Sequence, residues 1–206
     1  MLLRPSCLAR LGSRRPLGLA LVIDGQNSPH VFFDDFVVSA DRGRESVLRH
    51  AIAMGPLFIV EPIVSAAATA SRLDYVDALS AACTAQGLWV TFRSNNGDRY
   101  LLTNQGRGWA IVANATPFTG QAVSLLGHRD GRLYAVGGAG TFSSSNDFNL
   151  ALARNVATPS GPLEYVNLRP RGVYRLVRVG PLLSDADGGF HTTFQENSGE
   201  SLYATW

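Results

Sequence analysis

The fold is decided by the stretch from Gly87 to Trp206, which opens with GLWVTFRSNNGDRYL over residues 87–101. Two later segments, RLYAVGGAG at 132–140 and GVYRLVRVG at 172–180, repeat its order of an apolar residue, an aromatic residue and a glycine turn. Each copy continues through a strand that ends at Asn114, Asn155 or Asn197, and then through a closing strand. A unit that recurs about every 40 residues predicts a structural repeat.

Short runs of β-branched and aromatic residues, bounded by Gly, Asn, Asp and Ser, predict strands joined by tight turns. Repeats of this length occur in propellers, which have about four to eight blades, and in three-fold barrels such as the β-trefoil. Three copies are too few to close a propeller, so the repeat favours a β-trefoil-like domain. We expect the equivalent residues Trp89, Tyr134 and Tyr174 to pack together in one shared aromatic core.

The first copy resembles the fascin-like and ricin-B-like β-trefoils. Their pattern V-x-F-R-S-x-N-G-x-Y-L matches Val90–Leu101 here, and their following V-x-A-N corresponds to the strand end at 111–114. The resemblance covers residues 87–206 and implies a three-fold barrel. The Gln-X-Trp signature of ricin-type lectin repeats does not occur in this chain, so sugar binding does not come with the resemblance.

The part before the repeat is predicted to be a small α+β region. Residues 1–64 combine a basic arm with apolar strand runs at 17–23, 31–38 and 57–60, and the segment 46–54 fits a short helix capped by Ser46. Residues 65–86 are rich in alanine, with apolar residues at three-to-four spacing, and predict a helix that ends at Gly87. We therefore expect a mainly β protein in three parts: the α+β region at 1–64, a linking helix at 65–86 and the β-trefoil-like domain at 87–206.

The composition describes a globular chain of modest charge. The net charge is +2, too small to indicate nucleic-acid binding, and every basic residue other than histidine is arginine. No apolar run reaches the ~18 residues that a membrane-spanning helix needs. The two cysteines, Cys7 and Cys83, do not form a disulfide framework. The basic segment 1–23 fits either a targeting segment or an ordered arm. A virion or the cytoplasm is the favoured location, and secretion and organelle import stay open.

Candidate binding residues lie on polar loops, because recognition on a rigid scaffold usually takes place there. The candidate loop residues are Asn95, Asn96 and Asp98, then Ser145, Asn146 and Asp147, and finally Asp185 and Asp187. A basic patch of Arg169, Arg171 and Arg175 shares strand parity, which fits either a phosphate or acidic partner or a solvated strand.

No complete catalytic or metal-binding signature occurs in the chain. The loop that begins at Asp185 and Asp187 starts like a calcium loop, but the glycines that follow break the pattern. The four histidines lack metal-ligand spacing, and no Gly-X-Ser-X-Gly elbow is present. The sequence therefore predicts no cofactor, no metal and no enzymatic activity.

These observations favour a non-catalytic recognition or structural module within a larger assembly, such as a phage virion or tail accessory protein. Its partners would be proteins of the assembly or a surface glycan, and a homo-oligomer fits this interpretation. The alternative is a free-standing, lectin-like carbohydrate-binding protein. A third hypothesis is an enzyme whose site carries no recognisable motif. The sequence does not identify the ligand.

Overall fold

The computed structural model describes most of the chain as antiparallel β-sheet. The residues described are 2–3, 18–39, 43–65, 77–93, 99–106, 108–112, 118, 123–139, 149–156, 163–165, 176–196 and 199–206. Within these ranges there are four sheets and no helix, so no helix there is long or apolar enough to cross a membrane.

Each sheet is built from strands that follow one another along the chain. The first contains β1 (Leu2–Leu3), β2 (Leu19–Ile23), β3 (Pro29–Ser39), β4 (Gly43–Met54) and β5 (Leu57–Ser65), in the order β1-β5-β4-β3-β2. The second contains β6 (Asp77–Thr84), β7 (Gly87–Arg93), β8 (Arg99–Asn104) and β9 (Trp109–Val112) in that order. The third contains β10 (Val123–Gly127), β11 (Leu133–Ala139), β12 (Asn149–Ala153) and β13 (Leu163–Tyr165), also in order.

The fourth sheet is centred on β16 (Phe190–Glu196). On one side β14 (Leu176–Val179) and β15 (Leu183–Ser184) pair with successive parts of β16, and on the other side β17 (Ser201–Thr205) pairs with it. All of the pairings in the four sheets are antiparallel, as expected for strands joined by short hairpin turns.

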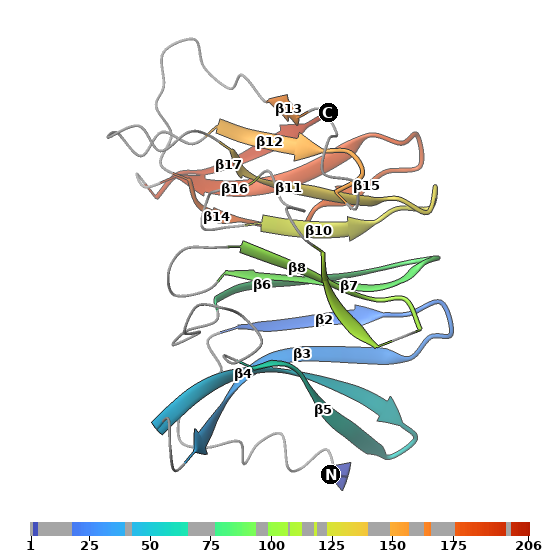
Figure 1. Ribbon diagram of the computed structural model, residues 1–206. Helices are drawn as coiled ribbons and strands as arrows, with labels where there is room; N and C mark the ends of the chain where they lie inside the picture. Colours follow the sequence, from blue (N-terminus) through green and yellow to red (C-terminus); the bar gives the residue numbers. More distant parts are fainter. Residues whose placement is uncertain are drawn as a thin grey trace.

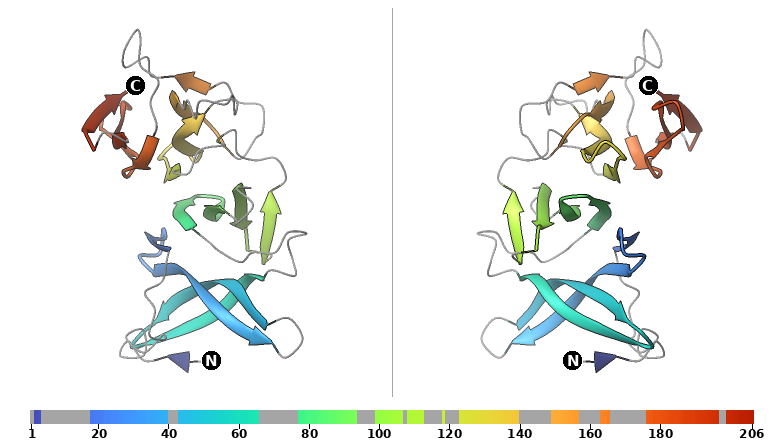
Figure 2. Two further views of the ribbon diagram at one scale, coloured as in Figure 1. Left: turned by 90° about the vertical axis from the view of Figure 1, so that its left-hand side faces the viewer. Right: turned by 90° about the vertical axis from the view of Figure 1, so that its right-hand side faces the viewer.

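The four sheets are stacked in sequence order along the molecule (Figure 1) and follow an arc when viewed from the side (Figure 2). The first strand of the second sheet, β6, packs against β2 of the first sheet and β10 of the third. Two serine hydroxyls join neighbouring sheets at these strands, because Ser80 Oγ accepts the N–H of Leu125 and Ser124 Oγ accepts the N–H of Leu182. Antiparallel sheets of four or five strands that follow one another along the chain and pack face to face resemble the blades of a β-propeller.

Apolar side chains fill the spaces between successive sheets. The cluster shared by the first and second sheets is Phe32, Leu48, Val90, Phe92 and Leu102. The cluster shared by the second and third includes Trp89, Leu101, Leu125, Leu133 and Ala151. The cluster shared by the third and fourth includes Tyr134, Val136, Leu152, Phe190 and Phe194. Because strand side chains alternate between faces, each middle sheet contributes to two clusters, and each buried large side chain stabilises the fold by roughly 1.5–3 kcal/mol.

The expected shared aromatic core of a β-trefoil is therefore wrong. Trp89 lies between the second and third sheets, whereas Tyr134 lies between the third and fourth. Tyr174 is outside the described residues. The three predicted copies do not coincide with the sheets: the first and second copies begin at β7 and β11, the second strands of their sheets, and residues 173–175 of the third copy are outside the described residues.

Both expected helices are wrong where the structure describes them. Residues 46–54 lie within β4, and 77–84 form β6, while 66–76 are outside the described residues. In β6 the small side chains have a packing role, since Ala81 packs against the cluster of the first two sheets and Ala82 lies in the cluster of the second and third. Close packing between first strands thus overrides the helix propensity of alanine. The division of the chain into domains at 64 and 86 stays a prediction.

Candidate functional site

Four hairpin turns, one from each sheet, lie one after another along one edge of the molecule, on the right in Figure 1. They follow β2, β6, β10 and β15 and consist of residues 24–28, 85–86, 128–132 and 185–189, which we call the hairpin rim. The third and fourth turns are joined by a hydrogen bond of 2.7 Å from Arg129 Nη2 to the carbonyl oxygen of Ala186. Gly25 of the first turn forms a backbone hydrogen bond to the thiol of Cys83, which lies just before the second turn. Burial raises the pKa of this thiol, and the bond from Gly25 lowers it to a smaller extent.

The first and last turns of the rim carry the same unit, an aspartate followed six residues later by a histidine. Asp24 Oδ2 lies 3.1 Å from His30 Nε2, and Asp185 Oδ2 lies 2.7 Å from His191 Nε2. In each turn the other carboxylate oxygen accepts backbone N–H groups, from Ser28 at 2.7 Å and from Gly189 at 2.8 Å. The histidine bond is the largest of the causes that hold the pKa of Asp24 and Asp185 below the usual value, so both are ionised at neutral pH.

The two middle turns use related contacts. The indole N–H of Trp89 donates to Thr84 Oγ1 at 3.0 Å, and the hydroxyl of Tyr134 donates to Asp130 Oδ2 at 2.7 Å. Burial by itself would raise the pKa of Asp130, but bonds from Tyr134, from the N–H of Arg132 and from the adjacent histidine lower it to about 2. The rim therefore holds three ionised aspartates, each oriented by a ring on the strand that leaves its turn.

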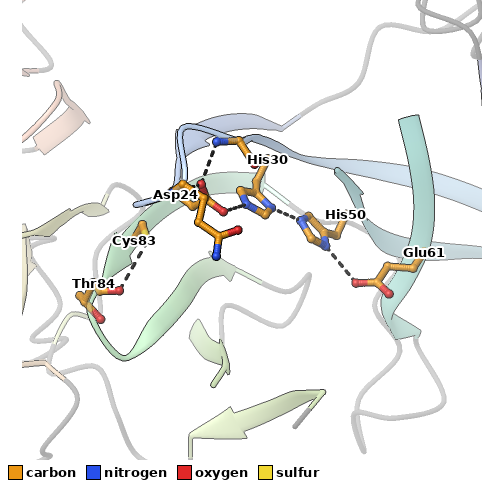
Figure 3. Close-up of polar contacts among 8 residues, drawn as sticks. Asp24, His30, His50, Glu61, Cys83 and Thr84 are labelled. Atoms are coloured by element: carbon orange, nitrogen blue, oxygen red, sulfur yellow. Dashed lines mark hydrogen bonds and ion pairs between the residues drawn. The ribbon is translucent and has the colours of Figure 1, made fainter. Parts of the chain in front are cut away.

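A chain of hydrogen bonds runs inward from Asp24, as Figure 3 shows. His30 Nδ1 lies 2.8 Å from His50 Nε2, and His50 Nδ1 lies 2.9 Å from Glu61 Oε1. Glu61 Oε1 also accepts the indole N–H of Trp109 at 3.0 Å. The chain crosses three neighbouring strands, because His30, His50 and Glu61 come from β3, β4 and β5.

The two central imidazoles are packed between the first two sheets. Both histidines are nearly inaccessible, and their rings stack with centroids 5.1 Å apart. Phe32 stacks on His50 at 4.9 Å, and Trp109 meets it edge-on at 5.4 Å. Burial is the largest cause that lowers the pKa of His50. Burial raises the pKa of Glu61, but its bonds from His50 and Trp109 outweigh that effect and lower it.

The sequence-predicted site residues divide into two groups. Asp185 and Asp187 lie in the fourth turn of the rim, where Asp185 caps the turn and binds His191. The other candidates fall outside the described residues: Asn95, Asn96, Asp98, Ser145, Asn146, Asp147, Arg169, Arg171 and Arg175. Within the described part of the chain, no group of three or more His, Cys, Asp or Glu side chains is arranged to hold a metal ion.

Sequence reasoning missed the chain of Asp24, His30, His50 and Glu61, because it tested the histidines for metal spacing alone. The signal was present in DGQNSPH at 24–30 and DADGGFH at 185–191, which place an aspartate and a histidine six residues apart on either side of a turn. Two copies of this spacing at the starts of hairpins indicate a recurring turn contact.

Comparisons with known proteins support the fold through solved structures. No family model and no curated protein matches the sequence. The endo-arabinase of Bacteroides thetaiotaomicron aligns with a TM-score of 0.55 at 12% identity, over 95% of this chain and 76% of its own. The α-L-arabinofuranosidase of Podospora anserina aligns with a TM-score of 0.51 at 11% identity, over 94% of this chain and 65% of its own. A fucose lectin from Kordia zhangzhouensis aligns with a TM-score of 0.39 at 11% identity, over 72% of this chain and 97% of its own.

These neighbours correct three expectations. The matching solved structures are not β-trefoils, and the resemblance to fascin-like and ricin-B-like proteins is overturned. The expected non-catalytic module of a virion or other assembly is also overturned, since this chain shares its fold with proteins named as arabinan-cleaving and arabinoside-cleaving enzymes. For the same reason the expectation of no enzymatic activity is withdrawn.

Proposed function

We propose that this protein is carbohydrate-active and binds a saccharide at the hairpin rim. The observation that carries the proposal is that three ionised aspartates, Asp24, Asp130 and Asp185, lie in turns that follow one another along one edge of the molecule. An ionised carboxylate accepts several hydrogen bonds, and sugar hydroxyls are donors. Because backbone N–H groups and rings already fix these carboxylates, a sugar would meet acceptors that lose little freedom on binding.

An exposed ring next to the rim supports the same function. Tyr203 is 59% exposed, and its ring stacks on His191 at a centroid distance of 5.9 Å. An aromatic face can cover the apolar C–H face of a sugar while the hydroxyls of the sugar bond to polar neighbours. The two solved structures with the same fold, named as acting on arabinosides, favour a saccharide over other polyhydroxylated ligands.

Hydrolysis of a glycosidic bond is the second candidate, because the ionised carboxylates of the rim fit one of the two carboxyl roles that the reaction needs. Glycosidases use one carboxylate as a base or nucleophile and a second carboxyl as an acid. Asp24 and Asp185 are both held in the ionised form that the first role requires. Under this hypothesis one of them activates water or attacks the anomeric carbon.

Titration calorimetry with arabinose-containing oligosaccharides and cellotriose tests the binding proposal. We expect saturable binding that Tyr203→Ala weakens at least about tenfold, while Tyr203→Phe, which keeps the ring face, retains it. Ser201→Ala serves as the control, since it changes an exposed side chain on the same strand as Tyr203 but outside the rim. The absence of binding to every saccharide tested would overturn the proposal.

Reducing-sugar release from the same saccharides tests the second candidate. Release that disappears in Asp24→Asn or Asp185→Asn supports hydrolysis at the rim. Binding without release at any pH between 4 and 8 would refute hydrolysis and leave saccharide binding in place.

A further inference from the structure

Three polar side chains form a continuous chain on the exposed face of the fourth sheet. Asp185 Oδ2 lies 2.7 Å from His191 Nε2, and His191 Nδ1 is hydrogen-bonded to the hydroxyl of Tyr203. The strand register brings the last two together: His191 pairs with Thr205 and Thr193 with Tyr203, so His191 and Tyr203 are diagonal neighbours on one face. The opposite face of the same strands is buried against the third sheet.

When the ring of His191 is neutral, the protons in this chain have one consistent arrangement. Asp185 is ionised and accepts, so His191 Nε2 carries the N–H that donates to it. In the neutral ring Nδ1 is then an unprotonated acceptor, and the hydroxyl of Tyr203 donates to it. This is the order of a nucleophile triad, in which a carboxylate orients a histidine that can take the proton of a hydroxyl.

Two related contacts in the same molecule lack a group that can react. In the first sheet Asp24 holds His30 in the same way, but the next group is His50, which is 4% exposed. In the third sheet Tyr134 is buried and donates to the carboxylate of Asp130, and burial followed by this bond raises the pKa of its hydroxyl. Tyr203 differs from both because its partner is an imidazole and its ring is open to solvent.

We propose that Asp185, His191 and Tyr203 form an acyl-transfer site in which Tyr203 is the nucleophile toward a carboxylic ester. The phenolic oxygen attacks the ester carbonyl carbon while His191 Nδ1 takes the phenolic proton. The bond from the carbonyl carbon to the ester oxygen then breaks, and the imidazolium returns its proton to the leaving alkoxide. Water afterwards cleaves the acyl-tyrosine, releasing the carboxylic acid and restoring the phenol, so the net reaction is ester plus water to acid plus alcohol.

This site goes beyond saccharide binding and does not rest on it. Asp185 is a positioning residue in this proposal, since it acts through the imidazole. The free phenol hydroxyl is a weak nucleophile, and a general base that removes its proton in the transition state typically contributes about 100-fold or more to the rate.

The experiment mixes the full chain with p-nitrophenyl acetate and follows p-nitrophenolate release, with mass spectrometry of the peptides. The chain contains no lysine, the usual competitor for acetylation, so the background is low. We expect a burst of about one p-nitrophenolate per protein and an acetyl group on Tyr203, with Tyr134 unmodified as the internal comparison.

Variants assign the roles. We expect Tyr203→Phe to abolish the burst and His191→Phe, which preserves a stacked ring, to slow it at least about 100-fold. Asp185→Asn keeps an oxygen for the N–H of Gly189 but cannot accept from His191 Nε2, so we expect a slowing of about tenfold or more with a changed pH profile. Ser201→Ala, which changes an exposed side chain on the same strand as Tyr203, should leave the rate unchanged.

Two results would overturn the proposal. One is acetylation of Tyr203 at the rate of an exposed tyrosine in a short peptide, and the other is a full burst in Tyr203→Phe. Because none of these outcomes involves a sugar, they separate the acyl-transfer site from the saccharide proposal.

Discussion

His30 Nδ1 lies 2.8 Å from His50 Nε2, and the outer nitrogen of each ring faces a carboxylate, Asp24 on one side and Glu61 on the other. Ionised carboxylates only accept hydrogen bonds, so His50 Nδ1 carries the proton that faces Glu61. Burial is the largest cause that lowers the pKa of His50, so its ring is neutral at pH 7 and its Nε2 is the acceptor that faces His30.

We expect nitrogen NMR of histidine-labelled protein at pH 7 to show His50 as a neutral ring protonated at Nδ1 alone. In Glu61→Gln the amide can donate to a bare His50 Nδ1, so the Nε2–H form of His50 should appear. A His50 ring protonated at Nε2 in the natural protein at pH 7 would contradict this arrangement.

The same chain makes the fold sensitive to acid. The pKa values of His50, Asp24 and Glu61 are all lower in the folded protein than their ordinary values of 6.5, 3.8 and 4.5. A group with a lowered pKa binds its proton more tightly in the unfolded chain, so protonation favours unfolding. The stability that these three groups contribute is fully present above pH 6.5 and falls first as His50 protonates. It falls further below pH 4.5, as Glu61 and Asp24 protonate.

We expect the free energy of unfolding, measured with urea, to be lower at pH 5 than at pH 7. His50→Gln should be less stable than the natural protein at pH 7, because its ring stacking is lost, but should lose less stability between pH 7 and pH 5. An equal loss in both proteins would show that His50 does not cause the acid sensitivity. Asp35→Asn is the control, since the ion pair of Asp35 with Arg49, at 2.6 Å, is not part of the histidine chain.

A glycine on the first strand of the third sheet tests the close contact between first strands. A Cβ at Gly127 would lie 1.6 Å from the carbonyl oxygen of Cys83, and backbone cannot turn aside as a side chain can. We therefore expect Gly127→Ala to destabilise the protein by about 1–3 kcal/mol or more in urea unfolding. Gly25→Ala is the matched control, with nothing within 4 Å of the new Cβ, and a similar loss in both variants would argue against the contact.

The sequence pattern indicated a mainly β protein with hairpin turns, but its period near 40 residues does not match the second, third and fourth sheets, which begin at Asp77, Val123 and Leu176. The first two copies start at the aromatic-bearing second strand of a sheet, so Val123–Gly127 counted as the end of one copy when it is the first strand of the next sheet. The alanine-rich β6 was read as helix because its small side chains serve contacts with β2 and β10, which lie far away in the sequence. With β6 and the N-terminal sheet included there are four units, and the argument against a propeller no longer applies.

The candidate site was harder to foresee for a related reason. Asp185 was singled out by its turn sequence, but its partner Tyr203 is brought to His191 by the pairing of β16 with β17. His50 and Glu61 meet His30 across two strand pairings. Register between strands depends on the whole sheet, so a single turn motif indicates the aspartate and the histidine but not the third group.

The last prediction concerns the two faces of the third sheet. Leu133 is buried toward the second sheet, whereas Leu152 and Val136 are buried toward the fourth and face each other across paired strands. Leu133→Ala and Leu152→Ala should each lower the free energy of unfolding by roughly 2–5 kcal/mol, and Val136→Ala should lower it by somewhat less. If the sheets are stacked, the loss of unfolding free energy in the double mutant Leu133→Ala and Leu152→Ala should equal the sum of the two single losses within about 0.5 kcal/mol, because the two side chains lie in different clusters.

The pair Val136→Ala and Leu152→Ala provides the matched comparison. These side chains are in contact, so their double mutant should depart from additivity by about 0.5 kcal/mol or more. Urea unfolding of the three single and two double variants measures both couplings. A single shared core, as in a three-fold barrel, would couple Leu133 to Leu152 as strongly as Val136 to Leu152. Only separate clusters on opposite faces of one sheet make the first pair additive and the second pair coupled.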